Sequence, residues 1–525
     1  MGFAKSYSAQ SVGLRAHMVC VEVDISKGMA SFSVVGLPDK SVDESKDRIS
    51  AAIKNSGYKS PKAKNQKIII SLTPANIKKE GTLFDLACAL TYLLAGGEIK
   101  FDTKEKLFLG ELGLNGELRP IKGALPLVQK AKENGFTEVF LPYENADEAS
   151  IIEGITVFGC KTLLQVIKHL NTMVSEEPIS QKSMLPHIPR KVERKEILHE
   201  YGFEDVRGQE TAKRGLEIAA AGRHNVLMFG PPGTGKTMLA RAFSQLLPEL
   251  SFEESLEITG IHSISGTLKE PLVTTAPFRA PHHTSSYVSL IGGGAFPKPG
   301  EVTLAHRGVL FLDEFPEFEK RVLESLREPL EEKFVSISRA KGTEVFPANF
   351  ILVAAMNPCP CGFKGTKKEC VCSAGDIYKY ERKLSGPIMD RIDIFLPVAE
   401  IDYKKLSDKI PEGMETSKDI RDRVLKARET QTKRFEGNPP SPKATDGRRK
   451  INTNSEMSAK DLEKFAPLGE KEKNLLNSAA TRMGLSPRAY HRIIKLARTI
   501  ADLEGSENIQ DKHLAEALGY REKKN

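Results

Sequence analysis

The sequence predicts an α/β protein with an N-terminal α+β domain, a central doubly wound parallel sheet and C-terminal helices. Strand and helix patterns alternate over residues 1–170, which indicates a mixed domain. Farther along, three short apolar runs each end in polar residues, as parallel strands do at the edge that carries a site. Apolar residues then follow helical spacing. We therefore place the central domain at 199–400 and the helices at 401–525, with a Pro- and Ser-containing linker at 171–198.

Local patterns place the individual elements. In the N-terminal domain we expect strands at 31–35, 67–72, 107–114 and 138–141, and helices at 85–95 and 124–134. In the remainder we expect helices at 210–221, 237–247, 419–435, 470–483, 487–503 and 511–518. Asp205 is the expected cap of the helix at 210–221, and Ser486 that of the helix at 487–503.

The central domain contains a phosphate-binding loop. An apolar run at 226–229 is followed by the eight residues Gly230, Pro231, Pro232, Gly233, Thr234, Gly235, Lys236 and Thr237. Glycines let backbone N–H groups turn toward a phosphate, and the start of the next helix adds its positive dipole. We expect Lys236 at the β- and γ-phosphates of ATP and Thr237 on Mg²⁺. The flanking strand and helix favour this interpretation over a Gly-rich turn that binds nothing.

Two further apolar runs supply the remaining chemistry of a hydrolase. Asp313 and Glu314 end the run before them; Asp313 suits the Mg²⁺ shell, and Glu314 suits the orientation of an attacking water. Asn357 follows the run at 350–355 and can sense the γ-phosphate. Because carboxyl ends of parallel strands meet at one edge, we expect these side chains beside the phosphate loop. Solvated loop charges are the alternative for the acid pair.

These motifs resemble those of AAA+ ATPases of the magnesium-chelatase branch. The likeness rests on 230–237, on Leu-Asp-Glu-Phe at 312–315 and on Ala-Ala-Met-Asn-Pro at 354–358; residues 278–284 and 299–308 make it similar to the ComM/YifB subfamily. The resemblance covers nearly the whole chain. It implies a hexameric ring driven by ATP and Mg²⁺ that acts on DNA as a branch-migrating helicase in recombination or natural transformation. A chelatase-type motor for metal insertion, a remodelling factor and an ATP-dependent protease are the alternatives.

The same resemblance implies roles for two arginines. Arg391 stands in a segment, 386–393, that resembles the one whose arginine reaches a neighbouring subunit's nucleotide. A guanidinium against the γ-phosphate stabilises charge in the transition state. Pairing with Asp390 or Asp393 of the same chain is the alternative. Arg488 resembles the arginine of the helical lid that contacts nucleotide, although by sequence alone it is equally a surface residue.

The N-terminal domain resembles that of Lon proteases through residues 111–123, the stretch that leads to the catalytic lysine in that family. At the positions that match the nucleophilic serine and the lysine, this chain has Leu83 and Leu125. A serine nucleophile needs a base within hydrogen-bond reach, and two leucines provide neither group. We therefore expect a Lon-protease-like domain without peptidase activity. Ser71 and Lys122 form a dyad only under a different alignment.

Four cysteines follow Asn357 in two close pairs: Cys359, Cys361, Cys370 and Cys372. Four thiolates at one loop can surround Zn²⁺, although one intervening residue in each pair is tighter than the usual spacing. Reduced thiols without metal are the alternative. The remaining cysteines stand in apolar contexts typical of a core, and we expect no disulfides. The adjacent His282 and His283 are expected on opposite faces of an extended chain, in a loop role rather than on one metal ion.

The charge of the chain points to a polyanionic partner. Its formal net charge is +8, and residues 421–450 hold ten basic and four acidic side chains. A hairpin is predicted over 334–346 with Arg339 and Lys341 at its tip, where six copies in a ring would face DNA phosphates. Solvated surfaces are the alternative for both. No apolar run approaches the ~18 residues of a membrane span, and the start lacks a secretory pattern, so we expect a cytoplasmic protein.

Overall fold

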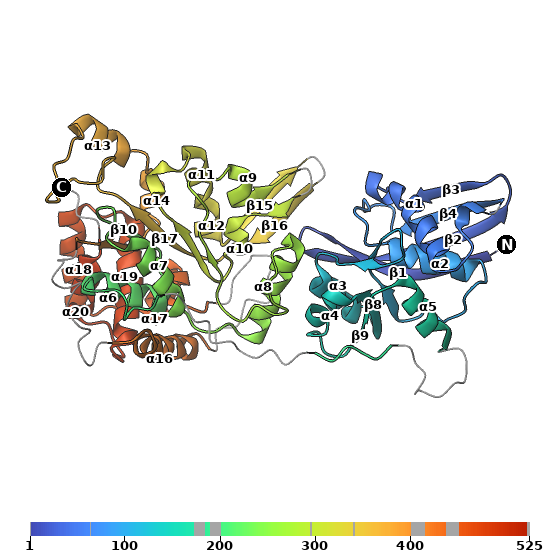
Figure 1. Ribbon diagram of the computed structural model, residues 1–525. Helices are drawn as coiled ribbons and strands as arrows, with labels where there is room; N and C mark the ends of the chain where they lie inside the picture. Colours follow the sequence, from blue (N-terminus) through green and yellow to red (C-terminus); the bar gives the residue numbers. More distant parts are fainter. Residues whose placement is uncertain are drawn as a thin grey trace. The chain divides into compact units, whose positions relative to one another are not determined.

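The computed structural model describes residues 2–63, 65–172, 184–189, 201–294, 297–339, 342–400, 415–436 and 451–521. The chain forms two compact units, each with a core of its own (Figure 1). The first combines Met1–Arg194 with Phe252–Val273, and the second combines Lys195–Ser251 with Thr274–Asn525. Parts of the predicted linker and of the basic segment 421–450 lie outside the described residues.

The first unit is built on a seven-stranded sheet of order β3-β4-β2-β1-β5-β8-β9. Its strands are β1 (Gly2–Val12), β2 (Arg15–Lys27), β3 (Ser31–Val35), β4 (Gln66–Thr73), β5 (Lys106–Phe108), β8 (Glu138–Pro142) and β9 (Thr156–Cys160). β1 and β2 form a long antiparallel hairpin, and Gly13 takes the positive φ of 57° in the turn between them. β4 continues the antiparallel pairing, whereas β5, β8 and β9 run parallel. Val19, Val21 and Val23 of β2 are buried at alternate positions, as a half-covered strand requires.

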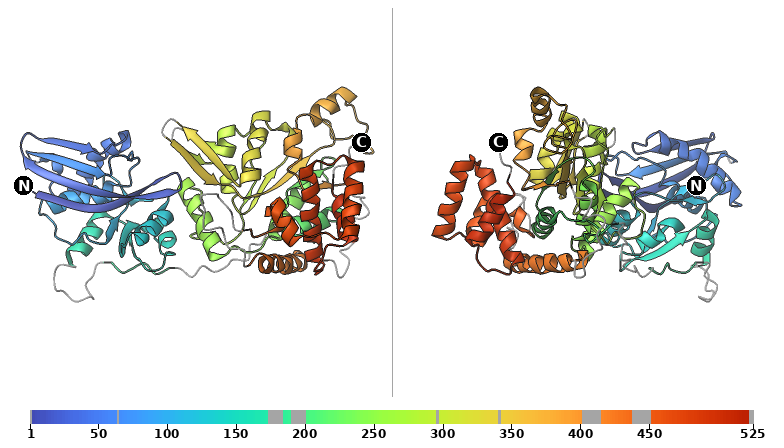
Figure 2. Two further views of the ribbon diagram at one scale, coloured as in Figure 1. Left: turned by 180° about the vertical axis from the view of Figure 1, so that it is seen from behind. Right: turned by 60° about the vertical axis from the view of Figure 1, so that its left-hand side comes forward.

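Helices pack against this sheet in the first unit (Figure 2). They are α1 (Lys40–Asn55), α2 (Asp85–Ala95), α3 (Ala124–Glu133), α4 (Tyr143–Ala149) and α5 (Leu163–Thr172); α8 (Phe252–Ser265) belongs to the same unit. α2 is apolar on nearly every side and is buried from Asp85 to Leu93, whereas α1 buries one face only. α8 comes from between two strands of the central domain, yet it packs on α3 within this unit.

Leu83 and Leu125, the residues expected in place of a Ser/Lys dyad, meet at one hydrophobic cluster. Leu125 is 1% exposed, and the partly buried Leu83 packs against the cluster that contains it. Leu256 of α8 packs on the same cluster. The carboxylate of Glu148 accepts hydrogen bonds from the backbone N–H of Leu125 (2.9 Å) and from the hydroxyl of Ser263, and so joins α3 to the end of α8. Leu83 and Leu125 thus take part in an apolar contact with α8, and the assignment of a Lon-protease-like domain stays a prediction.

The second unit contains a five-stranded parallel sheet of order β11-β14-β17-β10-β18. Its strands are β10 (Val226–Phe229), β11 (Phe278–Arg279), β14 (Val309–Leu312), β17 (Ile351–Met356) and β18 (Ile394–Pro397). The three inner strands, β14, β17 and β10, are continuous apolar runs because both faces of a parallel sheet are covered. β10 lies between β17 and β18, so the loop that follows it opens at the carboxyl edge beside the end of the central strand β17.

Helices and two hairpins complete this unit. The helices of the sheet region are α6 (Glu210–Gly222), α7 (Lys236–Gln245), α9 (Tyr287–Ile291), α10 (Glu301–Leu304), α11 (Lys320–Ser325), α12 (Arg327–Glu332), α13 (Ala374–Glu381) and α14 (Gly386–Met389). The C-terminal bundle contains α16 (Ser417–Phe435), α17 (Ala459–Phe465), α18 (Glu470–Met483), α19 (Pro487–Leu503) and α20 (Asp511–Gly519). The hairpins are β12 (Gly292–Gly293) with β13 (Lys298–Pro299) and β15 (Phe334–Arg339) with β16 (Gly342–Pro347). The short strands β6 (Glu111–Leu112) and β7 (Leu118–Arg119) belong to the first unit.

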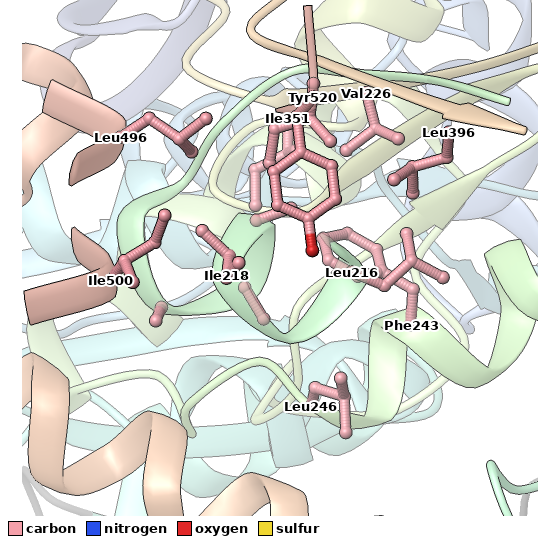
Figure 3. Packing of buried hydrophobic residues seen from close by; sticks show 14 of the residues in the cluster. Leu216, Ile218, Val226, Phe243, Leu246, Ile351, Leu396, Leu496, Ile500 and Tyr520 are labelled. Carbon is pink, nitrogen blue, oxygen red and sulfur yellow. The ribbon is translucent and has the colours of Figure 1, made fainter. Parts of the chain in front are cut away.

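The sheet and the C-terminal bundle share one hydrophobic core. Figure 3 shows Leu216 and Ile218 of α6 between Val226 of the sheet and Leu496 and Ile500 of α19. All five are buried. Each such side chain removed from water contributes about 1.5–3 kcal/mol. The bundle is therefore packed onto the parallel sheet rather than joined to it by a linker alone.

The predicted fold class is confirmed, with differences in local detail. The expected strand at 107–114 is two short strands, β5 and β6, which belong to different sheets. Ser486 caps α19 as expected, by accepting from the N–H of Ala489 at 3.2 Å. The prediction for Asp205 is wrong: Gln209 occupies the cap of α6, and the Asp205 carboxylate accepts instead from the N–H of Gly202. No described helix is long and apolar enough to cross a membrane.

Candidate nucleotide-hydrolysis site

The phosphate loop connects β10 to α7. Gly233 and Gly235 have φ of 76° and 85°, a region that other residues enter only with strain. A Cβ at Gly230 would overlap the carbonyl oxygen of Val398, so this position accepts only glycine. Gly235 is also the N-cap of α7, which aims the first N–H groups of the helix into the loop.

Lys236 is held inside this loop. It is 8% exposed, and its ammonium group donates to the carbonyl oxygens of Gly230 and Pro231, both at 2.7 Å. It also donates to Oδ1 of Asn357 at 3.2 Å. Burial lowers the pKa of Lys236, and the charge of Asp313 opposes that shift. Lys236 thus contacts both the phosphate loop and Asn357, which follows β17.

The acid pair lies beside the first turn of α7. Oγ1 of Thr237 donates to Oδ2 of Asp313 at 2.9 Å, so the two oxygens expected on Mg²⁺ are adjacent. Oxygen donors of this kind are what Mg²⁺ prefers, and the pair fits that ion. Glu314 is exposed, with a positive φ of 50°, and its Oε2 is 2.9 Å from Nδ1 of His283.

The contact between His283 and Glu314 does not follow from the sequence. The expectation that His282 and His283 point to opposite faces is wrong, because the chain turns there and the N–H of Ser285 donates to the carbonyl of His282 at 2.9 Å. Their ring centroids are 4.1 Å apart. His283 therefore reaches Glu314, while His282 bonds to Thr284 at 2.9 Å.

Arg391 and Arg488 meet on a single carboxylate, that of Glu331 at the end of α12. Arg391 is 3% exposed; it pairs with Oε2 of Glu331 and donates to the carbonyl of Pro387 at 2.5 Å. Nη2 of Arg488 is 2.7 Å from Oε1 of the same residue. Asp393, expected as the alternative partner of Arg391, pairs instead with Arg492 at 2.5 Å.

Asn225 anchors the segment of Arg391 to the sheet, and sequence reasoning missed it. It is 5% exposed just before β10. Its Nδ2 donates to the carbonyl of Arg391 at 3.0 Å, and its Oδ1 accepts from the N–H of Leu352 at 2.9 Å. Only its polar character before an apolar strand could have drawn attention to it.

The four cysteines of the loop after β17 form one cluster. Their sulfur atoms all lie within 4.8 Å of one another, and this group could hold a metal ion. Sγ of Cys359 is 3.4 Å from that of Cys361 and 3.7 Å from that of Cys370. Thiolates bound tetrahedrally at about 2.3 Å from Zn²⁺ lie about 3.8 Å apart, so the cluster fits that ion. The N–H of Lys364 donates to the sulfur of Cys359 at 3.3 Å.

The predicted DNA-contacting hairpin is present as β15 and β16. The register pairs Arg339 with Gly342, and the hydroxyls of Ser338 and Thr343 are 3.0 Å apart. Arg339 ends β15, but its side chain is outside the described part of the structure, as is the whole of Lys341. The backbone therefore has the expected form, and both side-chain assignments remain predictions.

A phosphate loop with an adjacent acid pair at the carboxyl edge of this sheet defines a P-loop nucleotide hydrolase of the AAA+ class. Three family descriptions match the chain: magnesium chelatase, subunit ChlI, at residues 202–406; subunit ChlI of Mg-chelatase at 21–145; and magnesium chelatase, subunit ChlI C-terminal, at 414–521. The chain belongs to this magnesium-chelatase-like family of AAA+ ATPases.

Relatives in bacteria match over the full length. Competence protein ComM of Haemophilus influenzae is 41% identical over 99% of this chain and 98% of its own. YifB of Escherichia coli is 39% identical over 99% of this chain and 97% of its own. A partial match outside the bacteria is DNA replication licensing factor mcm7-A of Xenopus laevis, which is 22% identical over 44% of this chain and 32% of its own. The resemblance to the ComM/YifB subfamily is thereby confirmed.

Proposed function

We propose that this protein is an ATP-driven DNA motor that works as a homo-oligomeric ring, a hexamer in the simplest form. The observation that carries the proposal is the convergence of three strand ends: Lys236 contacts Asn357, and Thr237 contacts Asp313. These are the parts that phosphoryl transfer from ATP needs, in mutual reach.

In this proposal the residues divide the work of hydrolysis. The loop from Gly230 to Thr237 wraps the phosphates, with Lys236 on the β- and γ-phosphates. Thr237 and Asp313 would hold Mg²⁺, which when bound neutralises charge on the phosphates. Glu314 orients and polarises the water, and Asn357 reports the γ-phosphate to β17. His283 holds the Glu314 carboxylate at 2.9 Å, which limits its orientation.

Arg391 and Arg488 complete the site of the next subunit. Each pairs with Glu331 rather than with a group of its own phosphate loop. Two guanidinium groups on one carboxylate form a concentrated positive charge, suited to a γ-phosphate presented by a neighbour. Nucleotide would then lie between subunits, and hydrolysis would require the ring. The lid arginine acts together with Arg391 in this arrangement.

DNA is the polymer we propose for the motor. The names of two relatives refer to competence and to DNA replication. Along the chain, the hairpin β15–β16 lies between β14, which ends before Asp313, and β17, which ends before Asn357. Hydrolysis can therefore tilt the hairpin, and Arg339 and Lys341 at its tip would contact phosphates in a central pore. Branch migration in recombination or natural transformation is the activity that this motor would serve.

The cysteine cluster is proposed as a structural Zn²⁺ site. Cys359, Cys361, Cys370 and Cys372 would supply all four ligands, with sulfur separations compatible with a tetrahedron. A site without an open position has a structural role rather than a catalytic one.

The decisive experiment measures ATP hydrolysis by the purified full-length chain with and without forked DNA, together with strand displacement. We expect Mg²⁺-dependent hydrolysis that DNA stimulates severalfold and a sigmoidal dependence on protein concentration as rings assemble. A hydrolysis rate that DNA does not change would contradict a DNA motor. It would favour the second candidate, a chelatase-type motor for metal insertion, which the descriptions of the matching family support. Absence of hydrolysis would overturn both.

A further inference from the structure

The cysteine cluster is attached directly to the nucleotide site. Cys359 stands two residues after Asn357 and is fully buried. Asn357 in turn accepts from Lys236 at 3.2 Å. One end of the cysteine loop, residues 359–372, therefore begins at the side chain that meets the phosphate-loop lysine.

The middle of the cysteine loop rests on the phosphate loop. Gly362 is buried, with φ of 85°, and its N–H donates to the carbonyl of Cys359 at 3.0 Å. A Cβ added at Gly362 would lie 2.8 Å from Cδ of Pro232 and 3.9 Å from Cγ of Asn357. Since real Cβ atoms do not approach a carbon at 2.8 Å, the backbone at Gly362 is in close contact with the Pro232 ring.

The far end of the cysteine loop returns to the same place. Cys372 is followed by Ser373, whose capping box with Asp376 starts α13. Tyr380 of α13 is 4% exposed. Burial raises the pKa of Tyr380 to about 12, and hydrogen bonding with the backbone of Asn357 opposes the rise. The segment that starts at Asn357 and runs through the four cysteines and α13 therefore returns to Asn357 through Tyr380.

We infer that the metal-closed cysteine loop is a brace for the nucleotide site, which positions Asn357 and Pro232 so that metal loading sets the affinity for ATP. This inference rests on the proposed ATP site and zinc site. Without a metal ion, the four neighbouring thiols have no common partner. The two ends of the cysteine loop, at residues 359 and 372, are then no longer joined through a metal. Gly362 and Tyr380 are then positioning residues, which act through Pro232 and Asn357.

A pair of glycine variants isolates the contact. Gly362→Ala and Gly365→Ala change the same loop at similar φ, 85° and 78°, but a Cβ at Gly365 meets nothing within 4 Å. Both variants carry the same backbone strain, and only the first pushes on Pro232. We expect about a tenfold weaker Kd for a fluorescent ATP analogue in Gly362→Ala, with zinc content unchanged, and a wild-type Kd in Gly365→Ala. Equal Kd values in the two variants would overturn the brace.

A second pair tests the metal. Cys370→Ser combined with Cys372→Ser should lower zinc per chain, measured by mass spectrometry of protein purified without a His-tag, and weaken the same Kd at least tenfold. Cys20→Ser, which alters a half-buried thiol of the first unit, should change neither. Chelation of the wild type should weaken the Kd, and added Zn²⁺ should restore it.

The outcomes separate the three proposals. Loss of zinc with an unchanged Kd would overturn the brace and keep the zinc site. A wild type without zinc would overturn the zinc site and the brace, yet leave the ATPase. A wild type that binds zinc and nucleotide but hydrolyses no ATP would overturn the proposed function, while the brace, which is measured by affinity, would still be supported.

Discussion

The carboxylate of Glu331 is shared by Arg391 and Arg488. One oxygen faces each guanidinium, and the three residues come from α12, from the loop before β18 and from the first turn of α19. Although burial alone would raise the pKa of Glu331, the hydrogen bond and charge of Arg391, with the charge of Arg488, keep that pKa below its ordinary value. Because Arg391 is buried and Arg488 is more than half exposed, the pair links the interior of the sheet domain to the outer surface of the lid.

This shared carboxylate gives a first prediction. In Glu331→Ala both arginines lose their common partner, so their placement for the neighbouring subunit is lost. We expect the turnover rate of ATP to fall about tenfold, while the Kd of an ATP analogue stays near wild type because Lys236 and its loop are untouched. Glu332→Ala removes a neighbouring exposed carboxylate of the same helix and serves as the control. Equal turnover rates in the two variants would show that Glu331 has no positioning role.

Complementation between subunits is the second prediction. Glu314→Gln removes the carboxylate that orients water, and Arg391→Ala removes the guanidinium supplied to the next subunit. Each variant alone should bind nucleotide but hydrolyse it about 10²–10⁴-fold more slowly. Mixed rings contain some interfaces with both groups intact, so mixing the two proteins should restore a measurable part of the activity.

The control for this mixture is built into the design. Glu314→Gln mixed with itself at the same total concentration should stay inactive, as should Arg391→Ala. A mixture no more active than the better single variant would indicate that Arg391 acts within its own subunit. Full activity in either single variant would contradict the assignment of the site.

Much of the site follows from local sequence because each part depends on a short segment. The strand 226–229 and the loop after it are encoded by an apolar run and by glycines that must adopt positive φ. The helices 470–483 and 487–503 were predicted with correct bounds because caps and apolar spacing are local signals. The order of the parallel strands is restricted by the requirement that their loops meet at one edge.

The contacts that sequence reasoning missed all join distant segments. Glu331 has no local pattern that distinguishes it from Glu332, and its role appears only when the fold brings Arg391 and Arg488 to it. His283 reaches Glu314 because the chain turns between His282 and Ser285; Pro281 precedes this turn, but neither of its central residues is a glycine or a proline. The docking of α8 on α3 depends on Leu256 and Leu125, which are ordinary apolar residues in the sequence. Tertiary packing, rather than propensity, decides these contacts.

The third prediction concerns Leu125, the residue expected at the position of the Lon-type lysine. Leu125→Ala removes buried methyl groups from the cluster that Leu256 joins, and we expect a loss of about 2–5 kcal/mol in the local stability of α3 and α8. Hydrogen exchange of peptides from 124–133 and 252–265 should accelerate in the full-length variant. Leu114→Ala, at a leucine that is 59% exposed, is the matched control and should leave both peptides unchanged. Unchanged exchange in Leu125→Ala would mean that α8 does not depend on this cluster.

The fourth prediction tests the hairpin as the DNA contact. Arg339→Ala with Lys341→Ala removes two positive charges per subunit next to the turn between β15 and β16, so fewer counterions are released on binding. We expect the variant to lose stimulation by DNA and strand displacement, and the slope of log affinity against log salt to become shallower. The ratio of hydrolysis rates with and without DNA is the measurement.

A charge-matched control makes that result specific. Lys471→Ala with Lys473→Ala removes two charges from exposed side chains of α18 and should keep both DNA stimulation and the salt slope. Because phosphate contacts read the backbone rather than the bases, the hairpin variant should weaken binding by a similar factor on unrelated sequences. If the hairpin variant unwinds forked DNA as well as the control variant does, movement of DNA does not depend on this hairpin. The basic helix α16 is then the surface to test, because it carries the described part of the basic segment 421–450.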